Sequence, residues 1–499
     1  MFKPLINIVW FKKDLRLQDH APSQAAIEQG LPTILLYCFE PSIMQDATTS
    51  NRHLRFIFQS LKAMEDELFK HNQHINIIQD EVIAFLEKLQ EQYIIKSIFS
   101  HQEIGNATTF KRDKQVKKFT IARGIEWIEL NTNGVIRGLQ NRSNFSEHWL
   151  KTMDATIFNV DLAKLKSIQL NIDIVGHLSL DESITQANKN FQPGGATTAQ
   201  QYLHSFLYDR KNNYSKHISK PLESRKSCSR ISPYLTYGNI SIKQVYQATL
   251  QAKKDTGDKK NINFFITRLH WHCHFIQKFE SECSIEYNNL NKGFNSVRNE
   301  INEHHLNAWK NAQTGFPLID ACMRCLTTTG YLNFRMRSML VSFLTHHLWQ
   351  PWQAGTHHLA KLFLDYEPGI HYPQFQMQAG TMGVNIIRIY NPVKQSQDHD
   401  PNGIFIKQWL PELANVPTAF IHEPWKITPF DVAKNVFELG NHYPKPIVQL
   451  EEAAKYAREH LWTIKKSKPV RENNRGILQK HTNRKTEKEK PLQLFANEE

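Results

Sequence analysis

The first 130 residues alternate between short apolar runs and amphipathic segments, and this alternation permits few architectures. The apolar runs have the length of β-strands and lie at residues 6–11, 33–39, 75–78, 94–99 and 125–130. Between the second and third runs, apolar side chains recur at helical spacing, at Leu54, Ile57, Leu61, Met64 and Leu68. Strands that alternate with helices imply a parallel sheet wrapped by helices. The sequence therefore predicts an α/β domain with a doubly wound parallel sheet over residues 1–135.

The rest of the chain follows a different pattern. From 136 to 195 the periodicity fades, Asn and Ser are frequent, and a Pro-Gly-Gly triplet ends the stretch. A loop this long is uncommon inside one compact unit, so we interpret it as an interdomain connection. Residues 196–462 have a helical pattern with few convincing strands, which predicts an all-α domain. Residues 463–499 are charged and poor in aromatic side chains, and we expect this basic tail to be disordered.

A basic excess is the clearest feature of the composition. The formal net charge is +13, and residues 464–499 contribute ten Lys and Arg against five Glu. About +8 therefore remains on the rest of the chain. A basic excess of this size attracts polyanions, and nucleic acid is the first candidate. A solvated excess without a nucleic-acid partner is the alternative.

No segment has the length and hydropathy of a membrane span. The mean hydropathy is −0.51, and no stretch approaches the roughly 20 apolar residues that cross a bilayer. The apolar run near the N-terminus is followed at once by charges, which is typical of a buried strand rather than a signal peptide. We therefore expect a cytoplasmic protein without a membrane partner.

The cysteine and histidine spacing offers little support for a metal site. Of six cysteines only Cys322 and Cys325 are close, and no second pair completes a zinc or iron–sulfur motif or a disulfide framework. His270 and His274 are four residues apart in a helical pattern and could present two ligands to zinc. No third ligand with suitable spacing is identifiable, so we expect no metal.

Two short segments carry residues suited to binding a ligand. Residues 227–232 (SCSRIS) precede a proline, and hydroxyl and backbone N–H groups at a helix start suit a phosphate. An ordinary helix cap is the alternative. Residues 365–372 (DYEPGIHY) place two carboxyl groups and an imidazole in one turn, which is costly to bury without partners. This loop is a second candidate ligand site.

Several blocks of the sequence together resemble one family, the DNA photolyases and cryptochromes. Residues 9–17 (VWFKKDLRL) look like the family's opening, and residues 309–326 (WKNAQTGFPLIDACMRCL) resemble a flavin-domain signature. Three further matching blocks occur in the same order, at residues 388–392, 405–413 and 422–425. Collinear blocks are far more specific than one motif. The resemblance, which runs from about residue 5 to 462, implies an α/β domain joined to a helical domain that binds U-shaped FAD.

The resemblance assigns residues to the FAD site. The positions that hold the FAD phosphates in the family correspond here to Tyr214, Cys228, Ser229, Arg230, Ile231 and Ser232. Arg337 and Asp365 fall on the salt-bridged pair beside the isoalloxazine ring, and Glu367 on the acidic position that follows. His371 falls on the neighbour of flavin N5. An imidazole there could protonate a flavin radical or act as a neutral hydrogen-bond donor.

The resemblance also assigns the substrate pocket and the electron relay, with departures in both. Trp271 falls on the tryptophan that stacks against a flipped-out pyrimidine dimer. Arg268 occupies the position where dimer-repairing members carry a lesion-binding glutamate. Trp352 is the middle tryptophan of the relay, whereas Phe375 and Asn299 replace the proximal and distal members.

The implied function is light-driven repair of pyrimidine dimers in DNA by reduced FAD, in a monomeric enzyme. The missing glutamate and altered relay favour a rival function, a cryptochrome-type photoreceptor. The two histidines of (6-4) photolyases correspond to Phe334 and Ser338, so that chemistry lacks its acid. Glu103 falls on the position that holds a folate antenna in some members. A second flavin, or no antenna chromophore, is equally compatible with the sequence.

Overall fold

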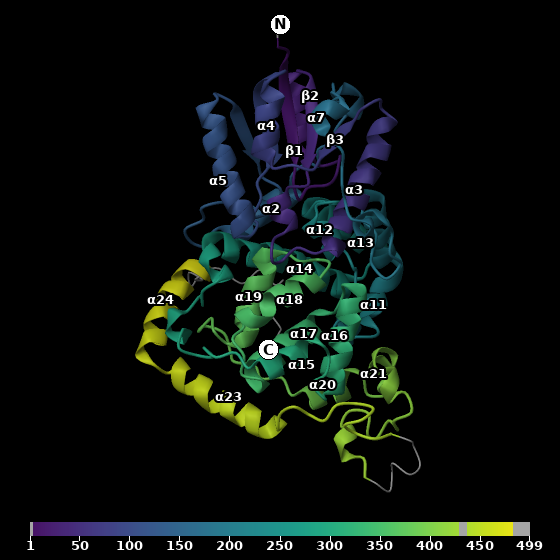
Figure 1. Cartoon of the computed structure of the whole chain (residues 1–499), viewed down its shortest axis with the longest axis vertical. Coiled ribbons are helices and arrows are strands. Elements are labelled where there is room, and N and C mark those ends of the chain that lie inside the picture. Colours follow the sequence, from purple (N-terminus) through teal and green to yellow (C-terminus); the bar gives the residue numbers. More distant parts are fainter. Residues whose placement is uncertain (1–2, 429–436, 483–499) are drawn as a thin grey trace.

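The computed structural model describes residues 3–428 and 437–482 of the chain. An α/β domain lies above a larger helical domain, and the two meet across a broad junction (Figure 1). None of the described helices combines the length and the apolar character needed to cross a bilayer.

The α/β domain is built on a five-stranded parallel sheet, as the sequence predicts. Its strands run in the order β3-β2-β1-β4-β5. They are β1 (Leu5–Phe11), β2 (Thr33–Cys38), β3 (Ile75–Ile78), β4 (Ile94–His101) and β5 (Glu126–Leu130). The direction in which strands are added reverses between β1 and β4, which is where open α/β sheets commonly bind ligands. The segments that follow these two strands face the helical domain.

Helices cover both faces of the sheet, which confirms the doubly wound prediction. Along β1, Ile6, Ile8 and Trp10 pack with side chains of α4 (Val82–Gln90) and α5 (Ala107–Ala122). Val9 and Phe11 point to the opposite face, where the core includes side chains of α1 (Ala21–Gln29) and α3 (Asn51–Phe69). Successive residues of a strand face opposite sides of the sheet. A strand buried on both faces therefore reads as a continuous apolar run.

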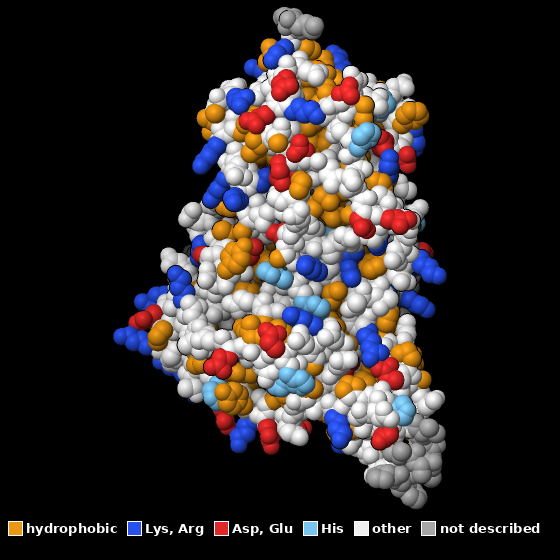
Figure 2. Space-filling view, viewed as in Figure 1, with side chains coloured by type: hydrophobic (Ala, Val, Ile, Leu, Met, Phe, Trp, Pro, Cys, Tyr) orange, Lys and Arg blue, Asp and Glu red, His pale blue; other side chains and the backbone are white. Residues whose placement is uncertain are grey.

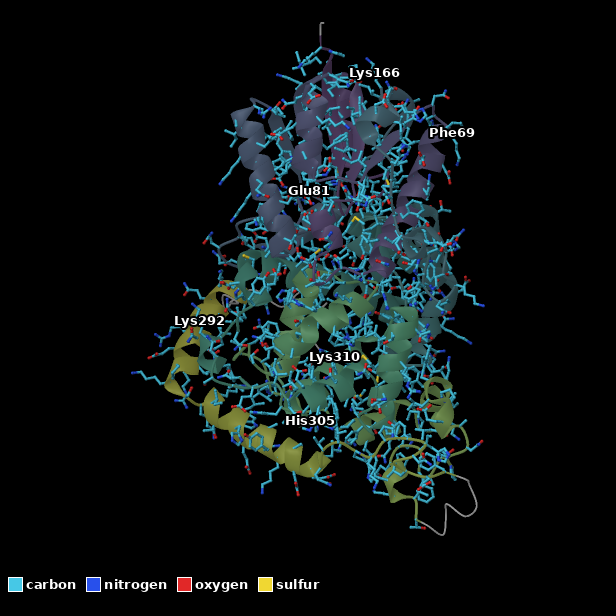
Figure 3. The ribbon with its side chains drawn as sticks, in the orientation of Figure 1. Phe69, Glu81, Lys166, Lys292, His305 and Lys310 are labelled. Atoms are coloured by element: carbon cyan, nitrogen blue, oxygen red, sulfur yellow. The ribbon has the colours of Figure 1, made fainter. Side chains whose placement is uncertain are left out.

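The segment 136–195 links the two domains but has more structure than the sequence indicates. Its helix α6 (Phe145–Asp154) buries Phe145, Trp149 and Met153. Further along, the backbone N–H of Ile168 donates to Thr33 O at 2.9 Å, so the segment runs beside β2, near Lys166 in Figure 3. The short helices α7 (Ile172–Val175) and α8 (Glu182–Thr185) follow. Helices this short leave little periodic signal.

The helical domain consists of many helices around a second large core. The longer ones are α9 (Ala196–Ser205), α13 (Ile242–Thr256), α14 (Lys259–Ser281), α16 (Pro317–Thr329), α17 (Phe334–Ser342), α18 (Gln353–Leu362) and α19 (Pro368–Ala379). The shorter ones are α10 (Tyr214–His217), α11 (Ser224–Ser227), α12 (Ser232–Thr236), α15 (Glu303–Lys310), α20 (Pro392–His399) and α21 (Ile404–Trp409). Trp309, Phe343 and Tyr372 are fully buried in its core. The all-α prediction for this part of the chain is confirmed.

The prediction of a disordered tail is wrong for the residues described here. Helix α23 (Leu450–Lys465) passes below the helical domain, and α24 (Lys468–His481) turns back up its side (Figure 1). Helix α24 buries Val470, Ile477 and His481, and it packs near Lys292, labelled in Figure 3. The sequence hides this face because its few apolar residues lie among charged ones. Residues 483–499 lie outside the described structure.

The junction between the domains is a close backbone contact. The N–H of Leu15 donates to Tyr237 O at 3.0 Å, and Arg16 Nη1 donates to Gly238 O at 3.1 Å. In return, Asn239 Nδ2 donates to Leu15 O at 3.0 Å. Gly238 has φ +67°, and a Cβ atom there would lie 2.5 Å from Asp14 Cα. A side chain at Gly238 would therefore push the two domains apart.

We expect Gly238→Ala to destabilise the protein more than Gly257→Ala, which serves as the control. Both glycines have a left-handed backbone, but a Cβ at Gly257 would meet nothing within 4 Å. The control should lose about 1 kcal/mol from backbone strain alone. Gly238→Ala should lose roughly a further 1–3 kcal/mol from the forced contact. Urea unfolding of the two variants measures the difference, and equal losses would contradict the junction described here.

Candidate functional site

An ion pair between α17 and the loop before α19 anchors the candidate site. Arg337 Nη1 and Nη2 donate to Asp365 Oδ1 and Oδ2 at 3.0 and 2.9 Å. The Asp365 side chain is 6% exposed, and Arg337 Nε is bound by Leu332 O at 2.6 Å. The guanidinium also lies 4.2 Å from the centre of the Phe363 ring. A bidentate pair held on all sides fixes the loop that follows Asp365.

The charge state of Asp365 follows from this pair. Burial alone raises the pKa of the carboxyl group, but the charge and hydrogen bonds of Arg337 outweigh burial and hold the pKa below its ordinary value. A carboxyl group whose pKa falls on folding stabilises the protein above its unfolded pKa. That stabilisation is lost only as the pH falls through the lower, folded pKa. The pair is therefore intact throughout the neutral range.

His371 lies on the first turns of α19 and is held neutral. Its Nε2 contacts Thr356 O at 3.0 Å, and the rings of Tyr366 and Phe375 lie 5.1 and 4.8 Å away. Burial, which outweighs the hydrogen bond to Thr356, lowers the pKa of His371 to about 3. Of the two roles that the sequence leaves open, the structure favours the neutral hydrogen-bonding imidazole, because no second proton is held near neutral pH.

Glu367 faces the α/β domain. Its carboxylate lies 3.9 Å from Lys13 Nζ and accepts a hydrogen bond from Gly369 N. Burial raises the pKa of Glu367, and the charge of Lys13 partly opposes this rise. Sequence reasoning did not single out Lys13, since nothing in the pattern relates two residues so far apart in the chain.

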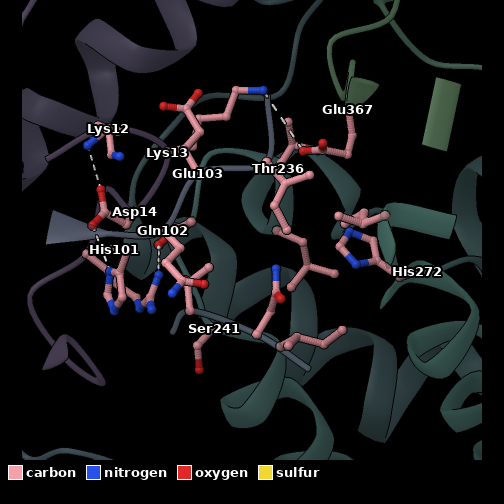
Figure 4. Close-up of a pocket in the computed structure, with 18 of the residues that line it drawn as sticks. Lys12, Lys13, Asp14, His101, Gln102, Glu103, Thr236, Ser241, His272 and Glu367 are labelled. Atoms are coloured by element: carbon pink, nitrogen blue, oxygen red, sulfur yellow. Dashed lines mark hydrogen bonds and ion pairs between the residues drawn. The ribbon is translucent and has the colours of Figure 1, made fainter. Parts of the chain in front are cut away.

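Lys13 and Glu367 line a pocket between the two domains (Figure 4). It holds about 670 Å³ of empty space, part of it open to solvent. The segments after β1 and β4 supply one wall, including His101 and Glu103. Helix α14 supplies another through His272. Ligands commonly bind at such a position, at the carboxyl ends of parallel strands beside the point where the strand order reverses.

A buried cluster of Asp14, His20 and His101 closes one end of this pocket. Asp14 Oδ2 lies 3.0 Å from His20 Nε2 and 2.7 Å from His101 Nδ1. By type and spacing these side chains could hold a metal, and sequence reasoning missed them. However, His20 Nδ1 already accepts the N–H of Ser23 at the start of α1, so its Nε2 carries the proton and donates to Asp14. The hydrogen bonds account for the cluster without a metal.

The segment predicted to hold phosphates has its N–H groups available. Arg210 Nη1 takes up the carbonyl oxygens of Lys226 and Cys228, at 2.8 and 2.5 Å. Arg230 has φ +59°, so the chain turns sharply between the two short helices α11 and α12. Within the described structure, no residue accepts from the N–H groups of residues 229–232. Successive N–H groups in such a turn form an anion-binding concavity, and Tyr214, the other predicted residue, is buried at the start of α10.

Trp271 and Arg268 lie side by side on α14. The Arg268 guanidinium is 5.0 Å from the centre of the Trp271 ring and 4.5 Å from that of Phe264. Trp271 is only partly buried. Lys13, rather than Arg268, supplies the cation beside Glu367. The pair therefore presents an aromatic surface with a fixed positive charge.

The predicted relay residues lie as the sequence suggests, with a gap in the middle of the route. Trp352 is 2% exposed, and its Nε1 donates to Asn289 Oδ1 at 2.8 Å. Asn299 and Trp352 line one hollow at the surface, whereas Phe375 lies inside beside His371. A phenylalanine does not relay an electron readily.

The carboxylate of Glu103 is already engaged. Arg112 Nη2 donates to it at 2.5 Å, and Arg112 Nη1 donates to Glu40 at 2.8 Å. A second hollow of about 860 Å³, partly open to solvent, lies beside this network at the carboxyl ends of β1 and β2. Its lining includes Tyr37 and Tyr366.

Comparisons with known proteins agree with this geometry. The family described as DNA photolyase matches residues 7–143, and the FAD binding domain of DNA photolyase matches residues 265–463. A cryptochrome DASH of Synechocystis is 26% identical over 91% of this chain and 98% of its own length. A deoxyribodipyrimidine photo-lyase of Alkalihalophilus pseudofirmus is 26% identical over 91% of this chain and 97% of its own.

Solved structures share the fold over nearly the whole chain. The Synechocystis cryptochrome superposes with a TM-score of 0.81 at 23% identity, covering 92% of this chain and 99% of its own. A bacterial class III photolyase of Agrobacterium tumefaciens gives the same score and identity, over 94% of this chain and 99% of its own. An archaeal photolyase of Sulfolobus tokodaii, described with two FAD molecules, gives 0.76 at 23% identity, over 92% and 100%.

We expect Asp365→Asn to cost far more stability than Glu412→Gln, its matched control. Both changes remove a carboxylate that binds an arginine through two hydrogen bonds, but the Arg324–Glu412 pair is substantially exposed. Stranding Arg337 should cost roughly 3–5 kcal/mol, whereas the exposed pair should cost about 1 kcal/mol or less. Urea unfolding provides the measurement. Similar losses in both variants would show that Arg337 does not depend on Asp365.

Proposed function

Because the chain belongs to the DNA photolyase and cryptochrome family and carries its FAD-binding domain, we propose that it is a light-driven DNA photolyase that splits pyrimidine dimers. The observation that carries this proposal is the exposed aromatic surface of Trp271 with Arg268 stacked beside it. Stacking on an aromatic side chain is how an extruded base is held. A charged donor beside the stack suits the polar edge of a pyrimidine.

When bound and reduced, FAD absorbs blue or near-UV light and supplies one electron, which the dimer returns after its two bridging C–C bonds break. No net oxidation or reduction occurs, so the reaction is a lyase reaction. The protein supplies binding, orientation and charge stabilisation.

The chain's own residues fit this cofactor. The free N–H groups of residues 229–232 would bind its phosphates, since they have no acceptor in the described structure. Arg337, held by Asp365, would place a fixed positive charge beside the ring and favour its reduced, anionic form. His371 would contribute a neutral imidazole.

Arg268 and Trp271 would act on the substrate. Trp271 would stack against the flipped dimer. Arg268 would donate hydrogen bonds to the pyrimidine carbonyl oxygens and stabilise the negative charge that the dimer gains with the electron. The overall basic charge would draw the DNA backbone to the protein before the lesion is recognised.

A signalling photoreceptor is the second candidate, and one observation favours it. Phe375 takes the place of an electron-relaying tryptophan between His371 and Trp352. Relatives with both kinds of name match this chain about equally well. Under this alternative, a partner would read the redox state of the flavin, and no dimer would be split.

For an antenna chromophore, the geometry favours a second flavin over a folate. The carboxylate of Glu103 is engaged by Arg112 and is not available to a pterin without breaking that pair. The hollow at the carboxyl ends of β1 and β2 has a volume within the range of ordinary ligand pockets. An aromatic lining suits a flat ring system.

We expect Arg268→Ala to lower the number of dimers repaired per absorbed photon while FAD content stays constant. The charge that stabilises the reduced dimer would be absent, and a lost charged hydrogen bond of about 1.5–3 kcal/mol corresponds to at least a tenfold fall. Arg123→Ala removes an equal charge from an exposed site on the α/β domain and is the control. The assay illuminates the reduced protein with dimer-containing single- and double-stranded DNA. If the unmodified protein repairs no dimer, the photoreceptor alternative replaces this proposal.

We expect Trp271→Ala to reduce discrimination between damaged and intact DNA. Stacking of a base on an aromatic side chain contributes about 1–3 kcal/mol, so the preference should fall at least fivefold. Trp462→Ala removes an exposed tryptophan from α23 and should leave the preference unchanged. Affinities for both DNAs are compared at one salt concentration. An unchanged preference in Trp271→Ala would place lesion recognition elsewhere.

A further inference from the structure

Basic side chains from three parts of the chain converge where the end of α24 meets α14. Arg142 precedes α6 and is 3% exposed, and Lys278 lies near the end of α14 and is 8% exposed. His481, the last residue of α24, is 3% exposed. His274 lies one turn before Lys278 on α14 and is almost as deeply placed. We refer to Arg142, His274, Lys278 and His481 as the basic cluster.

Direct contacts hold this cluster together. Arg142 Nη2 donates to His274 O at 3.4 Å, and its guanidinium lies 4.9 Å from the centre of the Phe145 ring. The same ring lies 6.3 Å from the ring of His274. Beside the cluster, Lys480 Nζ binds Glu282 Oε2 at 2.7 Å and fixes the end of α24 against the chain just after α14. Figure 1 shows α24 rising along the helical domain toward the α/β domain.

The cluster lacks hydrogen-bond acceptors. In residues 3–428 and 437–482, no group accepts a hydrogen bond from the Lys278 amine or from the rings of His274 and His481. The two nearby carboxylates are engaged elsewhere. Glu282 binds Lys480, and Glu280 accepts from Gly138 N and Gln277 Nε2. A buried amine without an acceptor is costly, so the site is incomplete as a purely structural arrangement.

The electrostatics define what could complete it. Burial and the charge of Arg142 lower the pKa of Lys278 to about 8, so the amine is still largely charged at pH 7. Burial, followed by the charges of Lys278 and Arg142, lowers the pKa of His481 to about 3. Lys480 lowers it further and Glu282 opposes the fall. The cluster thus offers two positive charges and two neutral imidazoles, each able to donate one N–H.

We propose that the basic cluster binds a phosphate group. A tetrahedral anion accepts several hydrogen bonds at once, and arginine and lysine together are the side chains that proteins use to bind it. An anion would supply the missing acceptors and neutralise the buried charge. The phosphate belongs to a nucleic-acid backbone or to a free phosphate compound. Trp271 lies two helical turns, about 10.5 Å, before Lys278 on the same face of α14, which makes the backbone a geometrically reasonable source.

The test uses the full-length protein and inorganic phosphate at pH 7 and constant ionic strength. We expect phosphate to bind the unmodified protein and to raise its unfolding temperature. Lys278→Met should weaken phosphate binding at least tenfold, because it removes a charged hydrogen bond. Lys468→Met removes an equal charge from the exposed start of α24 and should bind phosphate normally. His481→Phe is the second variant and should also weaken binding, by loss of a donor.

The phosphate-free proteins give an independent readout. Removing an uncompensated buried charge is neutral or stabilising, so Lys278→Met should unfold at the same or a higher temperature than the unmodified protein. Removal of an amine that the fold already satisfies would instead lower the unfolding temperature. That outcome would overturn the proposal.

A salt titration with undamaged duplex DNA distinguishes the two sources. If the backbone supplies the phosphate, Lys278→Met should reduce the slope of log affinity against log salt by about 0.9, and phosphate should compete with DNA. If a free compound supplies it, the slope stays the same and only phosphate binding is lost. Absence of phosphate binding by the unmodified protein, together with an unchanged slope in Lys278→Met, would refute the site. The outcome is independent of dimer splitting, which is measured separately.

Discussion

The buried carboxylate of Asp14 holds the junction on which both domains depend. It accepts from the backbone N–H of Lys12 at 2.7 Å and from the rings of His20 and His101. Burial raises its pKa, but the two imidazole donors reverse this effect and keep the pKa well below the ordinary value. A single charge thus joins the end of β1, the start of α1 and the end of β4. Because these three points are fixed, the turn at residues 12–16 presents a defined backbone to the helical domain.

From this turn the influence of the α/β domain reaches the candidate cofactor site. Lys13 extends from it to Glu367, two residues after the carboxylate that holds Arg337. The loop before α19 is therefore held from the helical side by Arg337 and from the α/β side by Lys13. The α/β domain is a structural part of the flavin site as well as a possible location for a second chromophore.

Sequence reasoning recovered what leaves a periodic or collinear signal. The five strands follow from apolar runs, and the pairing of Arg337 with Asp365 follows from family resemblance. The contact of Lys13 with Glu367 leaves no such signal, because it joins residues of different domains without a shared pattern. Helix α24 was missed for a related reason. Its buried Val470 and Ile477 are seven residues apart among charges, too sparse to indicate a core-facing helix.

The close approach at Gly238 bears on how this protein can exchange parts with its relatives. The turn at residues 12–16 and the segment around Gly238 fit each other through backbone atoms, and a single added carbon would collide with Asp14. An α/β domain taken from a relative could replace this one only if it carried the same turn and faced a glycine. The two domains are thus separate in architecture but inherited as one unit, and recombination between them should succeed only when both sides of this contact travel together.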